Sequence, residues 1–346
     1  MTAEPNAGGT VEGREPLEIP GPIGEPTGTV FDAAVEERLA EIETALLRAA
    51  EADTPLVTEA AQHVIAAGGK RFRPLLVVLA SSLGPRQDPE AVVKAATVVE
   101  LTHVASLYHD DVMDEAVLRR GSPSANDRWG NTVAILVGDY LFARASDLVA
   151  QLGPDYVRVQ AQTFARLVQG QIAETVGPAE DEDPLQHYLD VLAGKTGALI
   201  ATSALFGAMV ADADPDIQQR LARFGEEIGL VFQLSDDIID ITSDETGKTP
   251  GTDLRAGIPT LPTLLLRGYD APADRRLRER LDGDLREDEA LAEVLAELRR
   301  HPVIDEARAQ VGKRAEAARA LLEPLPPGPA KSALTDLCDT VVTRTA

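Results

Sequence analysis

Two stretches of this sequence are apolar on most faces of a helix and yet end in clustered aspartates. The first, residues 91–108, leads into an Asp-Asp-x-x-Asp sequence that begins at Asp110, and the second, residues 228–241, contains one that begins at Asp236. Helices that are apolar on most faces lie inside a bundle. One such cluster in so acidic a chain is explained equally well as a solvated helix end. Two such aspartate clusters, each on a strongly apolar helix, are hard to explain as solvent-exposed helix ends.

Apolar side chains recur at three- and four-residue steps from Phe31 onward, which predicts helices along nearly the whole chain. The expected helices are 31–50, 55–67, 72–83, 89–115, 131–152, 155–176, 184–194, 196–211, 215–241, 261–268, 287–300, 303–323 and 329–344. Glycine and proline pairs end many of them. We find no strand-like alternation, no Gly-x-Gly-x-x-Gly sequence and no internal repeat. We therefore expect a flexible tail at residues 1–28 and one all-α domain at residues 29–346.

The composition excludes several classes of protein. The chain has 346 residues and a formal net charge of −24 at pH 7, and such a surface repels nucleic-acid phosphates. Its apolar runs are much shorter than the roughly 20 residues of a membrane span. The single cysteine, Cys338, cannot form an internal disulfide, which favours a reducing, cytoplasmic location. The N-terminus lacks the basic start and apolar core of a secretory signal.

Each aspartate cluster places two carboxylates on one helical face. Asp110 and Asp114 are four residues apart, as are Asp236 and Asp240, so the two side chains of each pair lie one above the other. Two like charges there destabilise the helix unless a cation lies between them. Carboxylate oxygens select hard cations, and Mg²⁺ first when phosphate completes the coordination. The clusters therefore predict Mg²⁺ bound together with a phosphate compound.

Basic motifs accompany these clusters. Residues 68–74 (GGKRFRP) follow the end of one helix and begin the next, where backbone N–H groups and nearby cations favour an anion. Arg119 and Arg120 lie just past the first cluster, and the arginine fork suits phosphate oxygens. Further donors of this type are Lys195, Thr196, Gln233 and Lys248. Either basic run alone is more often a surface salt-bridge patch, but three of the six lysines of the chain lie in these motifs.

Taken in order, these motifs resemble those of the trans-isoprenyl diphosphate synthases, or polyprenyl synthetases, from about Phe31 to the C-terminus. The matching motifs are Gly-Gly-Lys-x-x-Arg-Pro at 68–74, Glu-Leu-x-His at 100–103, Asp-Asp-x-x-Asp-x-x-x-x-Arg-Arg-Gly at 110–121, Lys-Thr at 195–196, Phe-Gln-x-x-Asp-Asp-x-x-Asp at 232–240, Gly-Lys at 247–248 and Asp-Leu-x-x-Gly at 253–257. The resemblance implies an all-α isoprenoid synthase bundle around a deep central cavity. It also implies a homodimeric prenyltransferase that joins isopentenyl diphosphate to an allylic prenyl diphosphate.

The resemblance further implies roles for single residues. Asp110, Asp114 and Asp236 would hold about three Mg²⁺ ions, with Asp111 and Asp240 in support. The allylic diphosphate would contact Arg119, Lys195, Thr196, Gln233 and Lys248, and isopentenyl diphosphate would contact Lys70, Arg73, His103 and Arg120. Cations then neutralise the leaving diphosphate, the allylic C–O bond ionises and the double bond of the second substrate attacks. The departing pyrophosphate is the implied base for the final proton.

The chain departs from the family at one position. Family members often have a lysine after Asp-Leu-x-x-Gly, where this chain has Ile258. A phosphate-facing cation is thus missing from a loop expected to close over the site. Arg255 is a candidate substitute.

Small residues precede the first cluster. Ala105 and Ser106 lie about one helical turn before Asp110, where short-chain relatives carry bulky aromatics that form a floor. Tyr108 lies too close to the metal end to serve as that floor. Because the depth of an apolar pocket limits its ligand, the resemblance implies an all-trans product of about 30 to 45 carbons. The alternative is that these small residues only allow close helix packing.

Other functions stay open on the sequence alone. A geranylgeranyl diphosphate synthase would share every motif. A terpene cyclase would lack the isopentenyl diphosphate site, and a non-catalytic subunit of a two-component synthase would lose aspartates or the arginine pair, which this chain keeps. A Ca²⁺-binding acidic scaffold leaves the clustered lysines and arginines unexplained. A long product also implies peripheral membrane contact during its release. The residues without motif context, interpreted as structural, are Cys338, Trp129, His63, His187 and His301.

Overall fold

The computed structural model describes residues 30–242 and 250–345. In chain order its elements are α1 (Val30–Ala49), α2 (Pro55–Ala66), α3 (Phe72–Ser81), α4 (Pro89–Met113), β1 (Leu118–Arg119), β2 (Ser122–Pro123), α5 (Ala125–Trp129), α6 (Asn131–Ala150), α7 (Pro154–Val176), α8 (Pro184–Leu192), the π-helical turn η1 (Ala193–Gly197), α9 (Ala198–Val210), α10 (Pro215–Thr242), α11 (Thr252–Arg255), α12 (Leu261–Leu266), α13 (Pro272–Leu281), α14 (Asp288–Leu298), α15 (Val303–Leu322) and α16 (Pro329–Thr345). The expected all-α fold is confirmed, with one two-residue antiparallel hairpin, β1–β2. The predicted tail and Lys248 lie outside the described residues.

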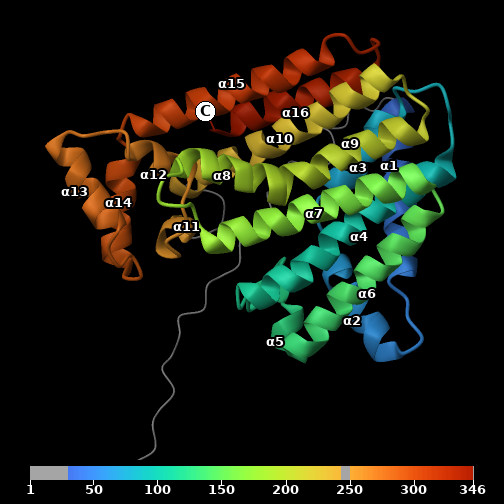
Figure 1. The fold of residues 1–346 in the computed structure, drawn as a ribbon, viewed down its shortest axis with the longest axis horizontal. Helices are drawn as coiled ribbons and strands as arrows, with labels where there is room; N and C mark the ends of the chain where they lie inside the picture. Colours follow the sequence, from blue (N-terminus) through green and yellow to red (C-terminus); the bar gives the residue numbers. More distant parts are fainter. Residues whose placement is uncertain (1–29, 243–249, 346) are drawn as a thin grey trace, which may run out of the picture.

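The helices form one bundle with α4 and α9 near its centre (Figure 1). Helix α4 packs against α3, α6 and α9, while α10 packs against α9 and α15. Helix α7 packs against both α6 and α9, so α4, α6, α7 and α9 form a ring in which α4 and α7 face each other. Helices α13 and α14 project from the end of the bundle at which α10 ends (Figure 1).

Two long apolar helical segments lie in the interior of this bundle. Pro89–Met113 and Pro184–Val210 are long and apolar enough to cross a membrane by length and composition, but 78% and 72% of their most apolar windows are buried inside the protein. Such burial is typical of core helices. Polar residues interrupt both segments, so neither contains an uninterrupted apolar run as long as a membrane span.

The predicted break between helices 184–194 and 196–211 is wrong. Helices α8 and α9 form one continuous segment through η1, where the hydrogen-bond spacing widens to that of a π-helix. Helix α7 comes very close at this point, because a Cβ on Gly170 would lie 2.6 Å from the backbone nitrogen of Lys195. π-Helical turns within α-helices often mark functional sites.

Three helices of the described residues, α5, α11 and α13, are absent from the helices expected from the sequence. Helices α5 and α11 have only five and four residues, too few to show a period. Helix α13 is dominated by arginine and acidic residues and buries little besides Leu277, so its apolar stripe is too short to stand out.

Close contact between α3 and α9 depends on Gly207. A Cβ at this position would lie 2.2 Å from the carbonyl oxygen of Val77. We expect Gly207→Ala to lower the free energy of unfolding by about 1–3 kcal/mol, because the two helices must move apart. The matched control is Gly312→Ala in α15, where nothing lies within 4 Å and alanine is expected to stabilise the helix by up to about 1 kcal/mol. Equal changes in the free energy of unfolding of the two variants, measured by urea unfolding, would contradict this close packing of α3 and α9.

Candidate active site

The first aspartate cluster lies at the C-terminal end of α4. Asp110 is in the last turn and Asp114 is the C-cap, whose N–H donates to the carbonyl oxygen of Asp110 at 2.8 Å. A helix C-terminus carries partial negative charge, so carboxylates are disfavoured there. Burial raises the pKa of Asp110 to about 6, the charge of Lys195 opposes that shift, and the charge of Asp114 adds to it. A cation at this helix end would offset both the unfavourable helix dipole and the cost of burying the carboxylate.

Asp111 has a different environment from its neighbours. Its side chain is fully buried, and its Oδ1 accepts a hydrogen bond from Nε of Arg119 at 2.6 Å. Its Oδ2 has no hydrogen-bond partner among the described residues. Burial raises the pKa of Asp111, although the Arg119 hydrogen bond opposes the shift. This ion pair holds the β1–β2 hairpin against α4, so the structure gives Arg119 a carboxylate partner, and its contact with the allylic diphosphate stays a prediction.

The second cluster lies in the last turns of α10. Asp237 is buried, and its Oδ2 accepts hydrogen bonds from the Tyr188 hydroxyl of α8 and from the N–H of Leu261 at 2.9 Å. Asp237 therefore ties α8 and the start of α12 to α10. Asp236 is half-buried beside it.

Asp240 holds the Asp-Leu-x-x-Gly segment in place. Its two carboxylate oxygens accept hydrogen bonds from the N–H groups of Thr252 and Asp253, each at 3.2 Å, at the start of α11. Arg255 of the same segment donates to Asp288 and to the carbonyl oxygen of Arg286. Arg255 is thus engaged with the start of α14, and its expected substitution for the missing lysine is not supported. Ile258 is half-buried.

The contacts of Lys195 and of the turn η1 show where the two aspartate clusters lie relative to each other. Its ammonium pairs with Glu174 of α7 and contributes to the field at Asp110. The turn η1 runs antiparallel to α10, since Gly229 lies against Gly197 and the Tyr188 hydroxyl bonds to Asp237. The structure therefore places both aspartate clusters at the same end of the bundle. Thr196 and Gln233 are half-buried on these same two elements.

The aspartates fit a divalent cation that is shared with a phosphate ligand. Within residues 30–242 and 250–345, no three Asp, Glu, His or Cys side chains converge closely enough to hold a metal ion alone. Mg²⁺ usually takes one or two carboxylates and completes its coordination with water and substrate phosphates. The raised pKa of Asp110 and the partnerless Oδ2 of Asp111 are both features that a nearby cation would stabilise.

Arg71 anchors the loop between α2 and α3. It begins α3 with a left-handed backbone (φ 50°) and donates to Glu43 at 2.6 and 2.7 Å and to Glu100 at 3.1 Å. Burial alone would lower the pKa of Arg71, but these two carboxylates raise it. No role was predicted for Arg71, because a motif does not show which of its cations meets a carboxylate in the fold.

Cations crowd the space between this loop, α4 and the β1–β2 hairpin. The buried Nε atoms of Arg73 and Arg120 have no hydrogen-bond partner in the described part of the chain. Burial lowers the pKa of Arg73 and lowers that of Arg120 to about 10. Burial, followed by the charges of Arg73 and Arg120, lowers the pKa of His103 well below its usual value. Lys70 is half-buried beside them. Desolvated cations in such a group fit an anion such as a diphosphate.

The two predicted chain-length residues lie on different sides of α4. A Cβ on Gly138 of α6 would lie 2.4 Å from His109 and 3.2 Å from the carbonyl oxygen of Ala105, so α4 and α6 pack closely there. Ala105 is fully buried at this contact, and its predicted role in chain length stays a prediction. Ser106 lies one turn below Asp110 on the same stripe of α4 and is 8% exposed, so it is the better candidate for a residue that faces the product.

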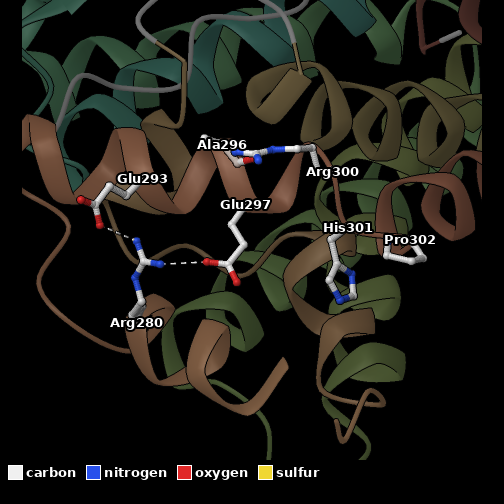
Figure 2. Close-up of a pocket in the computed structure, with 7 residues that line it drawn as sticks. All are labelled: Arg280, Glu293, Ala296, Glu297, Arg300, His301 and Pro302. Atoms are coloured by element: carbon white, nitrogen blue, oxygen red, sulfur yellow. Dashed lines mark hydrogen bonds and ion pairs between the residues drawn. The ribbon is translucent and has the colours of Figure 1, made fainter. Parts of the chain in front are cut away.

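A separate surface pocket lies between α13, α14 and the start of α15 (Figure 2). It has a volume of about 550 Å³ and contains none of the predicted site residues. Its Arg280 is bound by both Glu293 and Glu297, so this arginine is already neutralised. The expected deep central cavity stays a prediction.

Known proteins with similar sequences and structures agree with the chemistry of this site. Residues 54–298 match the profile of the family described as polyprenyl synthetase. The chain is 46% identical to a nonaprenyl diphosphate synthase of Mycobacterium tuberculosis over 91% of this chain and 95% of that protein. It is similar to the crystal structure of a geranylgeranyl pyrophosphate synthase from Corynebacterium glutamicum complexed with calcium and isoprenyl diphosphate (TM-score 0.84, 43% identity, 93% and 99% covered). It is also similar to a decaprenyl diphosphate synthase from Rhodobacter capsulatus (TM-score 0.83, 32% identity, 91% and 98% covered).

The buried Asp111–Arg119 ion pair predicts that neutralising Asp111 destabilises the fold much more than neutralising Asp114. We expect Asp111→Asn to lower the free energy of unfolding by about 3–5 kcal/mol, because Arg119 is left buried without its carboxylate. Asp114→Asn, on an exposed side chain, is the control and should change it by less than about 0.5 kcal/mol. Urea unfolding without metal measures both. A similar small effect for the two variants would show that the pair does not hold the hairpin.

Proposed function

Because the chain belongs to the polyprenyl synthetase family, we propose that it is a long-chain trans-prenyl diphosphate synthase, which condenses isopentenyl diphosphate with an allylic prenyl diphosphate. The observation that carries this proposal is the meeting of two carboxylate-bearing helix ends at one end of the bundle, with a group of desolvated cations beside the first of them. The carboxylates suit a metal-bound diphosphate, and the cations suit a second one.

The residues at the two helix ends would receive the allylic substrate. Asp110, Asp114 and Asp236 would hold Mg²⁺, which when bound stabilises the negative charge of a leaving diphosphate. Lys195, held at this end by Glu174, would place an ammonium beside the same diphosphate. Because Asp237 is fixed by Tyr188 and Leu261, the end of α10 is pre-organised, which lowers the reorganisation that the reaction requires.

The cationic group would bind isopentenyl diphosphate. The Nε–H groups of Arg73 and Arg120 have no hydrogen-bond partner among the described residues and could donate to phosphate oxygen, while another N–H of Arg120 donates to the carbonyl oxygen of Val64. His103 is neutral near pH 7, since its pKa is lowered, and it can donate one further hydrogen bond without adding charge. Arg71 holds the loop from which Lys70 extends. We infer that this group orients the second substrate, and that no side chain needs to act as the base if departing pyrophosphate takes the proton.

The product length is the finer part of the proposal. We propose an all-trans product of about 30 to 45 carbons. Two of the relatives described above are named for long products, a nonaprenyl chain at the upper end of this range and a decaprenyl chain just beyond it, which supports a product longer than geranylgeranyl diphosphate. Small Ser106, rather than an aromatic, one helical turn before Asp110 adds to that support. The alternative is geranylgeranyl diphosphate, for which the similarity to the Corynebacterium glutamicum structure is the specific observation.

One assay tests the function and its alternatives. Purified protein is incubated with Mg²⁺, radiolabelled isopentenyl diphosphate and allylic primers of two to four isoprene units, and the dephosphorylated products are sized by chromatography. We expect chains longer than those of a geranylgeranyl diphosphate synthase, and none after chelation of the metal. Inactivity until a second protein is added would instead support a subunit of a two-component synthase.

The aspartates at the two helix ends should be indispensable in this assay. We expect Asp110→Asn and Asp236→Asn each to lower the rate by about 10²-fold or more, because each removes a carboxylate that stabilises the charged transition state through metal. Asp147→Asn, on the exposed face of α6, is the matched control and should keep the wild-type rate. A fully active Asp110→Asn variant would contradict the proposed site.

A second copy of this chain is the partner that we propose. Helices α6 and α7 are joined by a short turn and run antiparallel, with the ring of Phe142 tilted against that of Phe164, so the start of α6 lies alongside the end of α7. Large apolar side chains are exposed there, among them Leu136 (61%) and Ile172 (56%). An apolar patch of this kind on an otherwise acidic surface is typical of a protein interface.

The exposed apolar side chains of α6 and α7 predict that the protein is a dimer. We expect the wild-type protein to be a dimer in size-exclusion chromatography with light scattering, and Leu136→Glu combined with Ile172→Glu to be a monomer, because charges would be buried in the contact. Leu56→Glu, on an exposed leucine of α2, is the control. A monomeric wild type, or a dimer that survives the double substitution, would contradict the proposed interface.

Two further inferences from the sequence stay predictions. The cytoplasmic location rests on the single Cys338, which is free and buried in α16. Membrane contact during product release rests on the expected length of the product.

A further inference from the structure

A belt of polar side chains crosses the apolar interior of the bundle well below the aspartates. Nε2 of Gln160 on α7 donates to Oγ1 of Thr102 on α4 at 2.6 Å. The hydroxyls of Thr163 on α7 and Thr202 on α9 are also 2.6 Å apart. All four side chains are at most 8% exposed. A polar layer in a helical core is costly unless its members bond to one another.

The Gln160–Thr102 hydrogen bond spans the ring of helices rather than one helix contact. Helices α4 and α7 each pack against α6 and α9, and they face each other across the ring. A side chain that reaches from α7 to α4 therefore crosses the space that the ring encloses. The Oε1 atom of Gln160 has no hydrogen-bond partner among the described residues, although it is buried.

This hydrogen bond lies on the path that leads away from the metal end. Asp110, Ser106 and Thr102 follow one another at four-residue steps on one stripe of α4, so Thr102 is about 12 Å below Asp110 along the helix axis. A prenyl chain attached to a diphosphate at Asp110 would reach that depth within its first few isoprene units. One turn deeper, Tyr156 of α7 and Phe206 of α9 form an edge-to-face aromatic pair.

We propose that the Gln160–Thr102 hydrogen bond is a crossbar in the path of the growing chain, and that Gln160 is a specificity-determining residue for product length. This inference rests on the proposed function. A chain that passes the crossbar must break the hydrogen bond and lie against the partnerless amide oxygen, which is unfavourable.

The free-energy cost of breaking the Gln160–Thr102 hydrogen bond decides how the crossbar would act. One neutral hydrogen bond contributes less net stability than the burial of one isoprene unit. A chain long enough to push past Gln160 therefore gains more from burial than it loses at the crossbar. Shorter chains that only touch it gain little, so the crossbar slows elongation at this length and favours release of short intermediates.

The experiment compares product distributions at limiting isopentenyl diphosphate, where release competes with elongation. Gln160→Ala removes the crossbar. The double variant Gln160→Leu with Thr102→Val replaces both partners by apolar groups, which leaves no buried polar atom unsatisfied. Gln162→Ala, on an exposed glutamine of the same helix, is the matched control. Circular dichroism verifies that each variant is folded, and the double variant carries the test if Gln160→Ala does not fold.

We expect both crossbar variants to raise the ratio of long to short products by about fivefold, which corresponds to one net hydrogen bond. Gln162→Ala should keep the wild-type ratio. An unchanged ratio in folded, active crossbar variants, or an equal change in the control, would overturn the proposal while leaving the proposed function intact. A wild type that makes no product from any primer would refute the proposed function instead.

Discussion

Negative charge at the C-terminal ends of two buried helices is the constraint on which the rest of this structure depends. Asp110 and Asp114 end α4, and Asp236 lies near the end of α10. Asp110 and Asp114 meet the negative end of the α4 dipole, and burial raises the pKa of Asp110 to about 6. Such an arrangement is unfavourable in the protein alone. It becomes favourable when cations and an anionic ligand enter together, which is the physical basis of a metal-dependent diphosphate site.

The aspartates divide into two groups by their partners. Asp111, Asp237 and Asp240 each fix another element: the hairpin through Arg119, α8 and α12 through Tyr188 and Leu261, and the start of α11 through backbone N–H groups. These contacts make the end of the bundle rigid. The half-buried Asp110 and Asp236 are the candidates for contact with the ligand, and the desolvated guanidinium groups of Arg73 and Arg120 supply the opposite charge beside α4.

The sequence predicted the helices and the site motifs, because apolar periodicity and four-residue spacing are local properties. It could not predict features that depend on tertiary contacts. The π-helical turn at Lys195 reflects the close approach of Gly170 on another helix, and α13 buries little besides Leu277. Likewise, the pairing of Arg119 with Asp111 and the separation of Ala105 from Ser106 on α4 appear only when the neighbouring elements are in place. The Gln160–Thr102 contact joins residues 58 positions apart and has no motif at all.

The central claim is that the two helix ends bind diphosphate only together with a divalent cation. Isothermal titration calorimetry of inorganic pyrophosphate tests it most directly, with and without Mg²⁺, on the wild type and on a variant with Asp110→Asn and Asp236→Asn. The account predicts tight binding to the wild type that requires Mg²⁺ and is lost in the variant. Pyrophosphate binding that is equally tight without Mg²⁺, or unaffected by the two substitutions, would contradict it.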